Sequence, residues 1–112
     1  MSGNAESAAV RDIYTINELR SIVAPIAKQH NVRSVYLFGS YARGSATSVS
    51  DIDLCVDAPA LRGMFALGSL YADLEDALRK KLDLITIGSL KYNSDSRFVE
   101  NLRKDQVLLY EQ

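Results

Sequence analysis

The sequence predicts an α+β fold in which helices pack against one small, mixed β-sheet. Segments with apolar residues at three- and four-residue steps alternate, as in α/β proteins, with short β-prone apolar runs. The 112 residues, 47% of them hydrophobic, suffice for one compact core, whereas two domains would each be marginally small. We therefore expect a single domain over residues 13–112, preceded by a flexible tail over residues 1–12 that is small and polar.

Three helices are expected. The first begins after Thr15, because Glu18 three residues later completes a capping-box pattern, and it runs through Pro25 toward His30. A second is expected over residues 61–81, with charged residues on one side and an apolar stripe on the other, formed by Phe65, Leu67, Leu70, Leu74, Ala77 and Leu78. The third is expected from about residue 94 to 104.

Four short runs have the composition of strands, and they lie at residues 35–38, 51–56, 82–87 and 107–110. The segment between the first two is rich in Ala, Gly, Ser and Thr, which predicts a short helical turn followed by a loop. One sequence does not give the order of the strands in the sheet.

Composition gives no support to several classes of function. The net charge of −1 lacks the basic excess of a dedicated nucleic-acid binder. No apolar run approaches the roughly 20 residues of a membrane helix, and the first residues do not form a signal peptide. The single cysteine, Cys55, cannot form an internal disulfide and is expected to be a small buried residue. These features fit a protein of the reducing cytoplasm.

Two carboxylates dominate the chemistry that the sequence predicts. Asp51 and Asp53 are two residues apart in a predicted strand, so they point to the same face with their backbones roughly 6.6 Å apart. Such a pair repels itself unless a hard cation lies between the two groups. Mg²⁺ binds one or two carboxylates and completes its coordination with water and phosphate oxygens.

Three further groups fit a phosphate and metal site. Gly39 and Ser40 follow the first predicted strand, where a glycine lets a phosphate approach the backbone and a hydroxyl can donate to it. Arg43 lies three residues on and could point to the same anion. Asp83 is a lone carboxylate in an otherwise apolar strand, and it would join the pair if its strand lies beside theirs.

Each feature alone has a purely structural explanation. A Gly-Ser pair is usually a turn, an Asp-x-Asp often lies on a solvated edge strand, and Asp83 could lie on the polar face of an edge strand. The conjunction favours a site, because the Gly-Ser pair, the ten residues after it, the Asp-x-Asp and the third Asp occur together.

In this combination, Gly39-Ser40 followed after ten residues by Asp51-Ile52-Asp53 resembles the signature of the DNA polymerase β-like nucleotidyltransferases. The flanking residues, Tyr36 to Gly44 and Ser50 to Leu54, resemble those of the minimal nucleotidyltransferases, the MNT or MntA-type antitoxins. This resemblance implies the nucleotidyltransferase fold, with Gly39 and Ser40 on the triphosphate and two Mg²⁺ ions at Asp51 and Asp53. It also implies that Asp83 is the third carboxylate at the metals and helps position or deprotonate an acceptor hydroxyl. Arg43 would contact a phosphate.

The resemblance further implies a partner. Family members of this size pair with a HEPN-domain ribonuclease toxin and transfer AMP from ATP to a tyrosine hydroxyl on it, so this chain would be the antitoxin of a type VII-like pair. The absence of an appended recognition domain fits an acceptor that docks as a protein. Two alternatives stay open: a non-catalytic antitoxin that masks its partner, and nucleotidyl transfer to a small molecule or RNA with a second subunit. Self-association also stays open.

Overall fold

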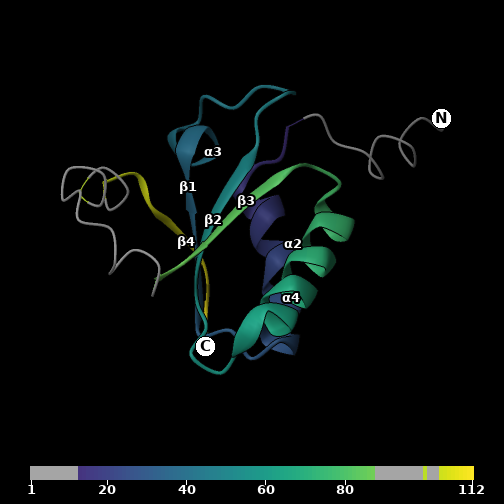
Figure 1. Ribbon diagram of the computed structural model, residues 1–112. Helices are drawn as coiled ribbons and strands as arrows, with labels where there is room; N and C mark the ends of the chain where they lie inside the picture. The colour runs from purple at the N-terminus through teal and green to yellow at the C-terminus, as the bar shows by residue number, and fades with distance from the viewer. Residues whose placement is uncertain (1–12, 88–99, 101–103) are drawn as a thin grey trace.

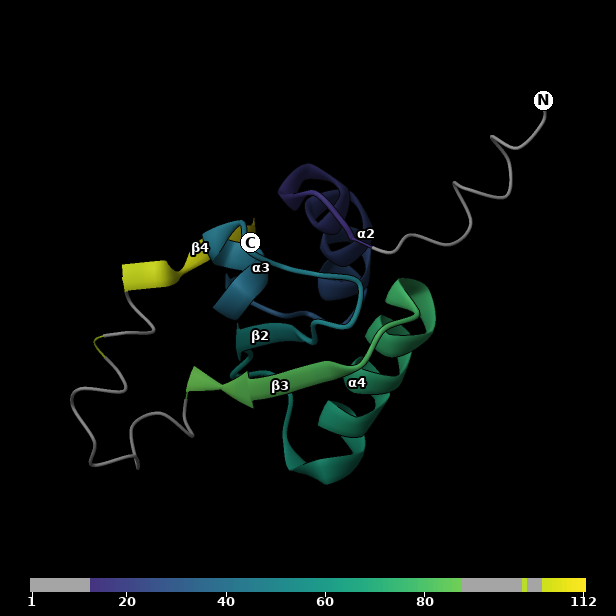
Figure 2. The same cartoon turned by 90° about the horizontal axis from the view of Figure 1, so that it is seen from above.

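The fold consists of two layers, a β-sheet and a pair of helices that cover one of its faces (Figure 1). The computed structural model describes residues 13–87, 100 and 104–112. α2 (Ile16–Gln29) and α4 (Gly63–Leu78) pack against each other on the same side of the sheet, as the view from above also shows (Figure 2). This arrangement confirms the predicted α+β class.

The sheet is mixed and has the strand order β3-β2-β1-β4. β1 (Ser34–Phe38) lies between two antiparallel neighbours, β2 (Ile52–Asp57) and β4 (Val107–Glu111). β3 (Leu82–Thr86) is parallel to β2 and forms the other edge. The four predicted strands are therefore confirmed, with one shift that matters below, because β2 begins at Ile52 and not at the preceding residue.

α2 begins and ends where the sequence predicts. The Thr15 hydroxyl accepts a hydrogen bond from the Glu18 amide at 3.1 Å, and the Glu18 carboxylate accepts one from the Thr15 amide at 2.9 Å. This capping box satisfies two amides that the helix itself leaves without partners. The helix continues through Pro25 and ends with His30 as its C-cap. Its buried face consists of Leu19, Val23 and Ala27.

α4 is shorter than predicted, and part of its apolar stripe does not enter the core. Leu70, Leu74 and Leu78 are fully buried, as expected from their spacing. Phe65, however, is 96% exposed, and Ala77 is also exposed, so these two members of the predicted stripe do not enter the core. At about 100° per residue, Phe65 lies on the opposite side of the helix from Leu74.

The core lies between the helices and the inner face of the two central strands, where the fully buried strand residues are Val35, Leu37, Ile52, Leu54 and Val56. The Tyr14 hydroxyl donates to the Leu78 carbonyl at 2.8 Å and so ties the start of the described chain to the end of α4. Within the described ranges, no helix is long and apolar enough to cross a membrane. The predicted tail over residues 1–12 and almost all of the predicted helix over residues 94–104 lie outside them.

Candidate active site

Two of the predicted carboxylates lie side by side in the sheet. β2 and β3 are parallel neighbours, and their register places Asp53 directly opposite Asp83. Adjacent strands lie about 4.8 Å apart, so the two side chains leave the sheet close together and on the same face. The condition set by the sequence, that the strand of Asp83 must lie beside that of Asp53, is therefore met.

Asp51 lies close to this pair but is held differently. The expected strand began at Asp51, whereas β2 begins one residue later, so Asp51 is outside the ladder and is exposed. Asp51 lies between the turn that precedes it and the first bond of the strand pairing, in which the Ile52 amide donates to the Lys81 carbonyl at 3.0 Å. Its charge nevertheless acts on Asp53, as the electrostatics of that group show.

The surroundings of Asp53 act on the ionisation of its carboxyl group. Partial burial raises its pKa above the usual value, and the charges of Asp83 and Asp51 raise it further, while Arg43 acts in the opposite direction. Like charges that share one volume disfavour ionisation of each member. The site therefore concentrates negative charge that a cation would relieve.

Gly39 and the carboxylate of Asp53 are in direct contact. Phe38, the last residue of β1, pairs with Asp53 in the sheet, so the chain passes the carboxylate as it leaves the strand. Gly39 has φ +70°, and a Cβ atom built on it would overlap the Asp53 Oδ2 atom and lie 3.1 Å from its Cγ. Glycine is required here for both its backbone conformation and its lack of a side chain.

Ser40 and Arg43 belong to α3 (Gly39–Arg43), the short helix that follows β1 at the same end of the sheet (Figure 1). Ser40 is half-buried beside the Gly39 contact. The exposed Arg43 guanidinium bonds through Nη1 to the Asp105 Oδ2 atom at 3.3 Å. Arg43 thus stands between the acidic group and Asp105, and sequence reasoning missed this second partner because it lies 62 residues away.

Tyr71 is a further neighbour that the sequence did not indicate. Its hydroxyl oxygen lies 3.3 Å from both the Leu82 carbonyl oxygen and the Glu75 carboxylate, and its single proton can be donated to either acceptor. Desolvation and the Glu75 charge raise the pKa of this phenol, and the charges of Asp83 and Asp51 contribute in the same direction. Its helical spacing from Glu75 was visible in the sequence, but its approach to β3 depends on the tertiary packing.

The donor set fits Mg²⁺ better than a metal held by protein alone. Among the described residues, no three His, Cys, Asp or Glu side chains converge as a ready-made metal cage. Mg²⁺ does not need one, because one or two carboxylates and the oxygens of a phosphate substrate satisfy it. All three aspartates offer hard oxygen ligands, and the missing side chain of Gly39 is what lets the Asp53 carboxylate lie against the chain that leaves β1.

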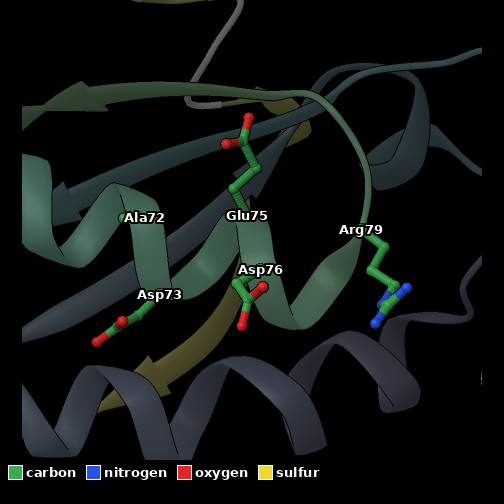
Figure 3. A pocket seen from close by; sticks show the side chains of 5 residues that line it. All are labelled: Ala72, Asp73, Glu75, Asp76 and Arg79. Carbon is green, nitrogen blue, oxygen red and sulfur yellow. The ribbon is translucent and has the colours of Figure 1, made fainter.

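A separate surface groove of about 630 Å³ lies along α4, and its lining does not include Asp51, Asp53 or Asp83. Figure 3 shows Asp73 and Asp76 on the side of α4 that faces α2, with Glu75 pointing the other way. Asp73 is bound to the His30 ring nitrogen Nε2 at 2.7 Å, which joins α4 to the end of α2. One of the residues that line the groove is therefore engaged in a contact between the helices, and we assign no chemistry to the groove.

Comparison with known proteins identifies the family of this chain. The family model described as "Polymerase beta, Nucleotidyltransferase" matches residues 20–112. A Methanocaldococcus jannaschii protein assigned as a protein adenylyltransferase is 36% identical over 93 residues, which cover 83% of this chain and 90% of that protein. The protein adenylyltransferase MntA of Thermococcus cleftensis is 35% identical over 81 residues, with 69% of this chain and 82% of the relative covered.

Solved structures show the same fold. A structure described as a minimal nucleotidyltransferase has a TM-score of 0.67 and 27% identity, and the match covers 84% of this chain and 95% of that one. A complex of the tri-AMPylated Shewanella oneidensis HEPN toxin with its MNT antitoxin gives a TM-score of 0.62 at 20% identity, covering 88% of this chain and 74% of that chain. The second likeness concerns the fold alone. With the family model matching most of its length, this chain belongs to the polymerase β nucleotidyltransferase family.

Proposed function

We propose that this nucleotidyltransferase transfers AMP from Mg²⁺-bound ATP to a tyrosine hydroxyl of a HEPN-domain toxin and thereby acts as its antitoxin. The observation that carries the chemistry is the contact between Gly39 and the Asp53 carboxylate, with Asp83 opposite in the next strand. This contact brings a backbone that can approach a phosphate against a carboxylate that can hold its metal.

Each residue of the site has a role in this proposal. Gly39 and Ser40 bind the triphosphate, and the Arg43 guanidinium pairs with one of its oxygens. Asp51 and Asp53 would hold two Mg²⁺ ions, which when bound would stabilise the attacking hydroxyl oxygen and the charge on the departing pyrophosphate. Asp83, on the β3 side of the site, would orient the acceptor hydroxyl or accept its proton as the oxygen attacks the α-phosphorus.

The nature of the acceptor is supported by the relatives. Two of them are named as protein adenylyltransferases, and one solved neighbour is an antitoxin bound to a HEPN toxin that carries AMP groups. A tyrosine on a docked partner fits a site that lies at one end of the sheet with Asp51 and Asp83 exposed to solvent. An exposed carboxylate can meet a hydroxyl that the partner presents.

The proposal is tested by incubating the purified chain with labelled ATP, Mg²⁺ and the HEPN protein encoded beside its gene. The toxin should gain label, and Asp51→Asn or Asp53→Asn should reduce the rate by about 100-fold. Asp57→Asn is the matched control, because Asp57 lies at the far end of β2, where its carboxylate faces Arg33 at 3.7 Å. Label that persists in the two site variants, or that never appears on the toxin, refutes the transfer.

The same variants separate transfer from masking in cells. Neutralisation of the toxin by the Asp51→Asn, Asp53→Asn double variant as complete as by wild type would show that binding alone suffices. Label on a small molecule or on RNA, with none on protein, would move the acceptor to that class.

A further inference from the structure

Asp51 needs a support that the other two carboxylates do not. Asp53 and Asp83 lie within strands, so the hydrogen bonds of the sheet hold their backbones. Asp51 precedes β2, and the first backbone bond after it is from the Ile52 amide to the Lys81 carbonyl at 3.0 Å. This bond holds the chain on the C-terminal side of Asp51, and the segment just before Asp51 holds it on the N-terminal side.

That segment is a closed turn over residues 47–50. The Ser50 hydroxyl accepts a hydrogen bond from the Thr47 amide at 2.8 Å, and the Ser50 amide donates to the Thr47 carbonyl at 3.1 Å. The two hydroxyls also lie within 3.3 Å of each other. Ser50 closes the turn through both its backbone and its side chain, and Asp51 is the next residue.

A lysine from elsewhere in the chain holds this turn. The Lys80 ammonium donates to the Ser48 carbonyl at 3.3 Å across a separation of 32 residues. Lys80 lies just after α4 and two residues before β3, so the same short segment supports the turn through Lys80 and pairs with Ile52 through Lys81. The connection that leads to Asp83 thus also holds the approach to Asp51.

We propose that the turn over residues 47–50, closed by Ser50 and tied down by Lys80, positions the Asp51 carboxylate for metal-bound nucleotide. Ser50 and Lys80 are positioning residues for the nucleotidyl transfer described above, and the inference rests on that proposed function. They act through the backbone of the turn. Each hydrogen bond restricts the motion of Asp51 in the ligand-free chain. Less conformational entropy is therefore lost when the metal and nucleotide bind.

The test measures binding of the ATP analogue AMP-PNP by titration calorimetry at a series of Mg²⁺ concentrations, with no acceptor protein present, so that no AMP is transferred during the titration. Ser50→Ala and Lys80→Met should each raise the half-saturating Mg²⁺ concentration by about threefold to tenfold, the effect of one hydrogen bond. Ser50→Thr and Lys80→Arg keep the groups concerned and should restore wild-type behaviour.

Matched controls lie next to each site of change. Ser48→Ala removes a hydroxyl that makes no hydrogen bond to another described residue, and Lys81→Met removes the same positive charge as Lys80→Met without breaking the tie to the turn. Both should bind like wild type. The Ser50→Ala, Lys80→Met double variant should bind AMP-PNP with an affinity within about twofold of the weaker-binding single variant. The reason is that both changes release the same turn.

Three outcomes overturn the inference. If Ser50→Ala and Lys80→Met bind like their controls, or lower the melting temperature without changing the Mg²⁺ dependence, the turn serves stability alone. If their effects on binding multiply in the double variant, they act independently and not through one turn. If the wild-type chain binds no AMP-PNP at any Mg²⁺ concentration, the proposed function fails, and the inference fails with it.

Discussion

Adding one methyl group at Gly39 gives the sharpest test of the site. Gly39→Ala introduces two costs that the structure separates. A non-glycine residue at φ +70° costs about 1–2 kcal/mol from backbone strain. The new Cβ would also overlap the Asp53 carboxylate, so that side chain must leave its rotamer at a further cost of about 1 kcal/mol. Together these terms predict a loss of about 2–3 kcal/mol in the free energy of unfolding.

Two other glycines measure the backbone strain alone, so the difference between them and Gly39→Ala gives the cost of the overlap with Asp53. Gly44 and Gly63 have φ of +78° and +83°, and a Cβ at either would meet nothing within 4 Å. Gly44→Ala and Gly63→Ala therefore carry the backbone strain alone and should each cost about 1–2 kcal/mol. Urea unfolding of the three variants gives these free energies, and Gly39→Ala should be the least stable by about 1 kcal/mol.

Nucleotide binding tests the role of Gly39 in the site more directly than the free energy of unfolding does. The methyl at Gly39 displaces the Asp53 carboxylate, so the Mg²⁺-dependent affinity for AMP-PNP should fall by at least about tenfold. Gly63→Ala, at the start of α4, should bind like wild type. If Gly39→Ala retains wild-type affinity while costing no more stability than Gly63→Ala, the contact with Asp53 is not part of the site.

Three further predictions follow from the charges and burial. Because the pKa of Asp53 is raised, ionised Asp53 destabilises the ligand-free fold above that pKa and is neutral in both states at low pH. Asp53→Asn should therefore raise the melting temperature at pH 7 by about 1–3 °C, and the difference should vanish toward pH 3; a drop at pH 7 contradicts this. Asp105→Asn frees the exposed Arg43 guanidinium, so AMP-PNP affinity at low salt should rise by about twofold while stability changes by less than about 0.5 kcal/mol, and weaker binding would show that Asp105 supports the site. Burial raises the pKa of the Cys55 thiol to about 11, so its reaction with a disulfide reagent at pH 8 should be about 100-fold slower in the folded than in the urea-unfolded chain.

The sequence predicted the strands that carry Asp53 and Asp83 better than it predicted the contacts that hold Asp51. Strand composition and period located Asp53 and Asp83, because residues within strands have a fixed face and a fixed spacing. Their pairing depended on the order of strands, which long-range packing decides. Asp51 was placed in a strand because β-prone residues follow it, but the ladder begins one residue later. Nothing local to Asp51 shows that Lys80 will hold the preceding turn.

Burial along α4 differs between two residues that the sequence analysis assigned to one apolar stripe. Leu70 is fully buried, whereas Phe65 is 96% exposed. Five residues separate them, so at about 100° per residue they lie about 140° apart around the helix axis. Phe65 therefore lies outside the face that Leu70, Leu74 and Leu78 bury, and counting the helical angle from these leucines would have excluded it from the stripe.

The spacing of the motif itself has a geometric explanation. β1 and β2 are antiparallel, so the chain that leaves β1 must turn and return for Asp53 to face the end of the same strand, opposite Phe38. The ten residues between Ser40 and Asp51 comprise the rest of α3, the segment 44–46 and the turn over residues 47–50. Inserting one residue between Ile52 and Asp53 would move the Asp53 carboxylate to the core face of the sheet. The separation of Gly39-Ser40 from the Asp-x-Asp pair is therefore the stretch of chain that leaves β1, turns and returns antiparallel to it, so that Gly39 and the Asp53 carboxylate come into contact.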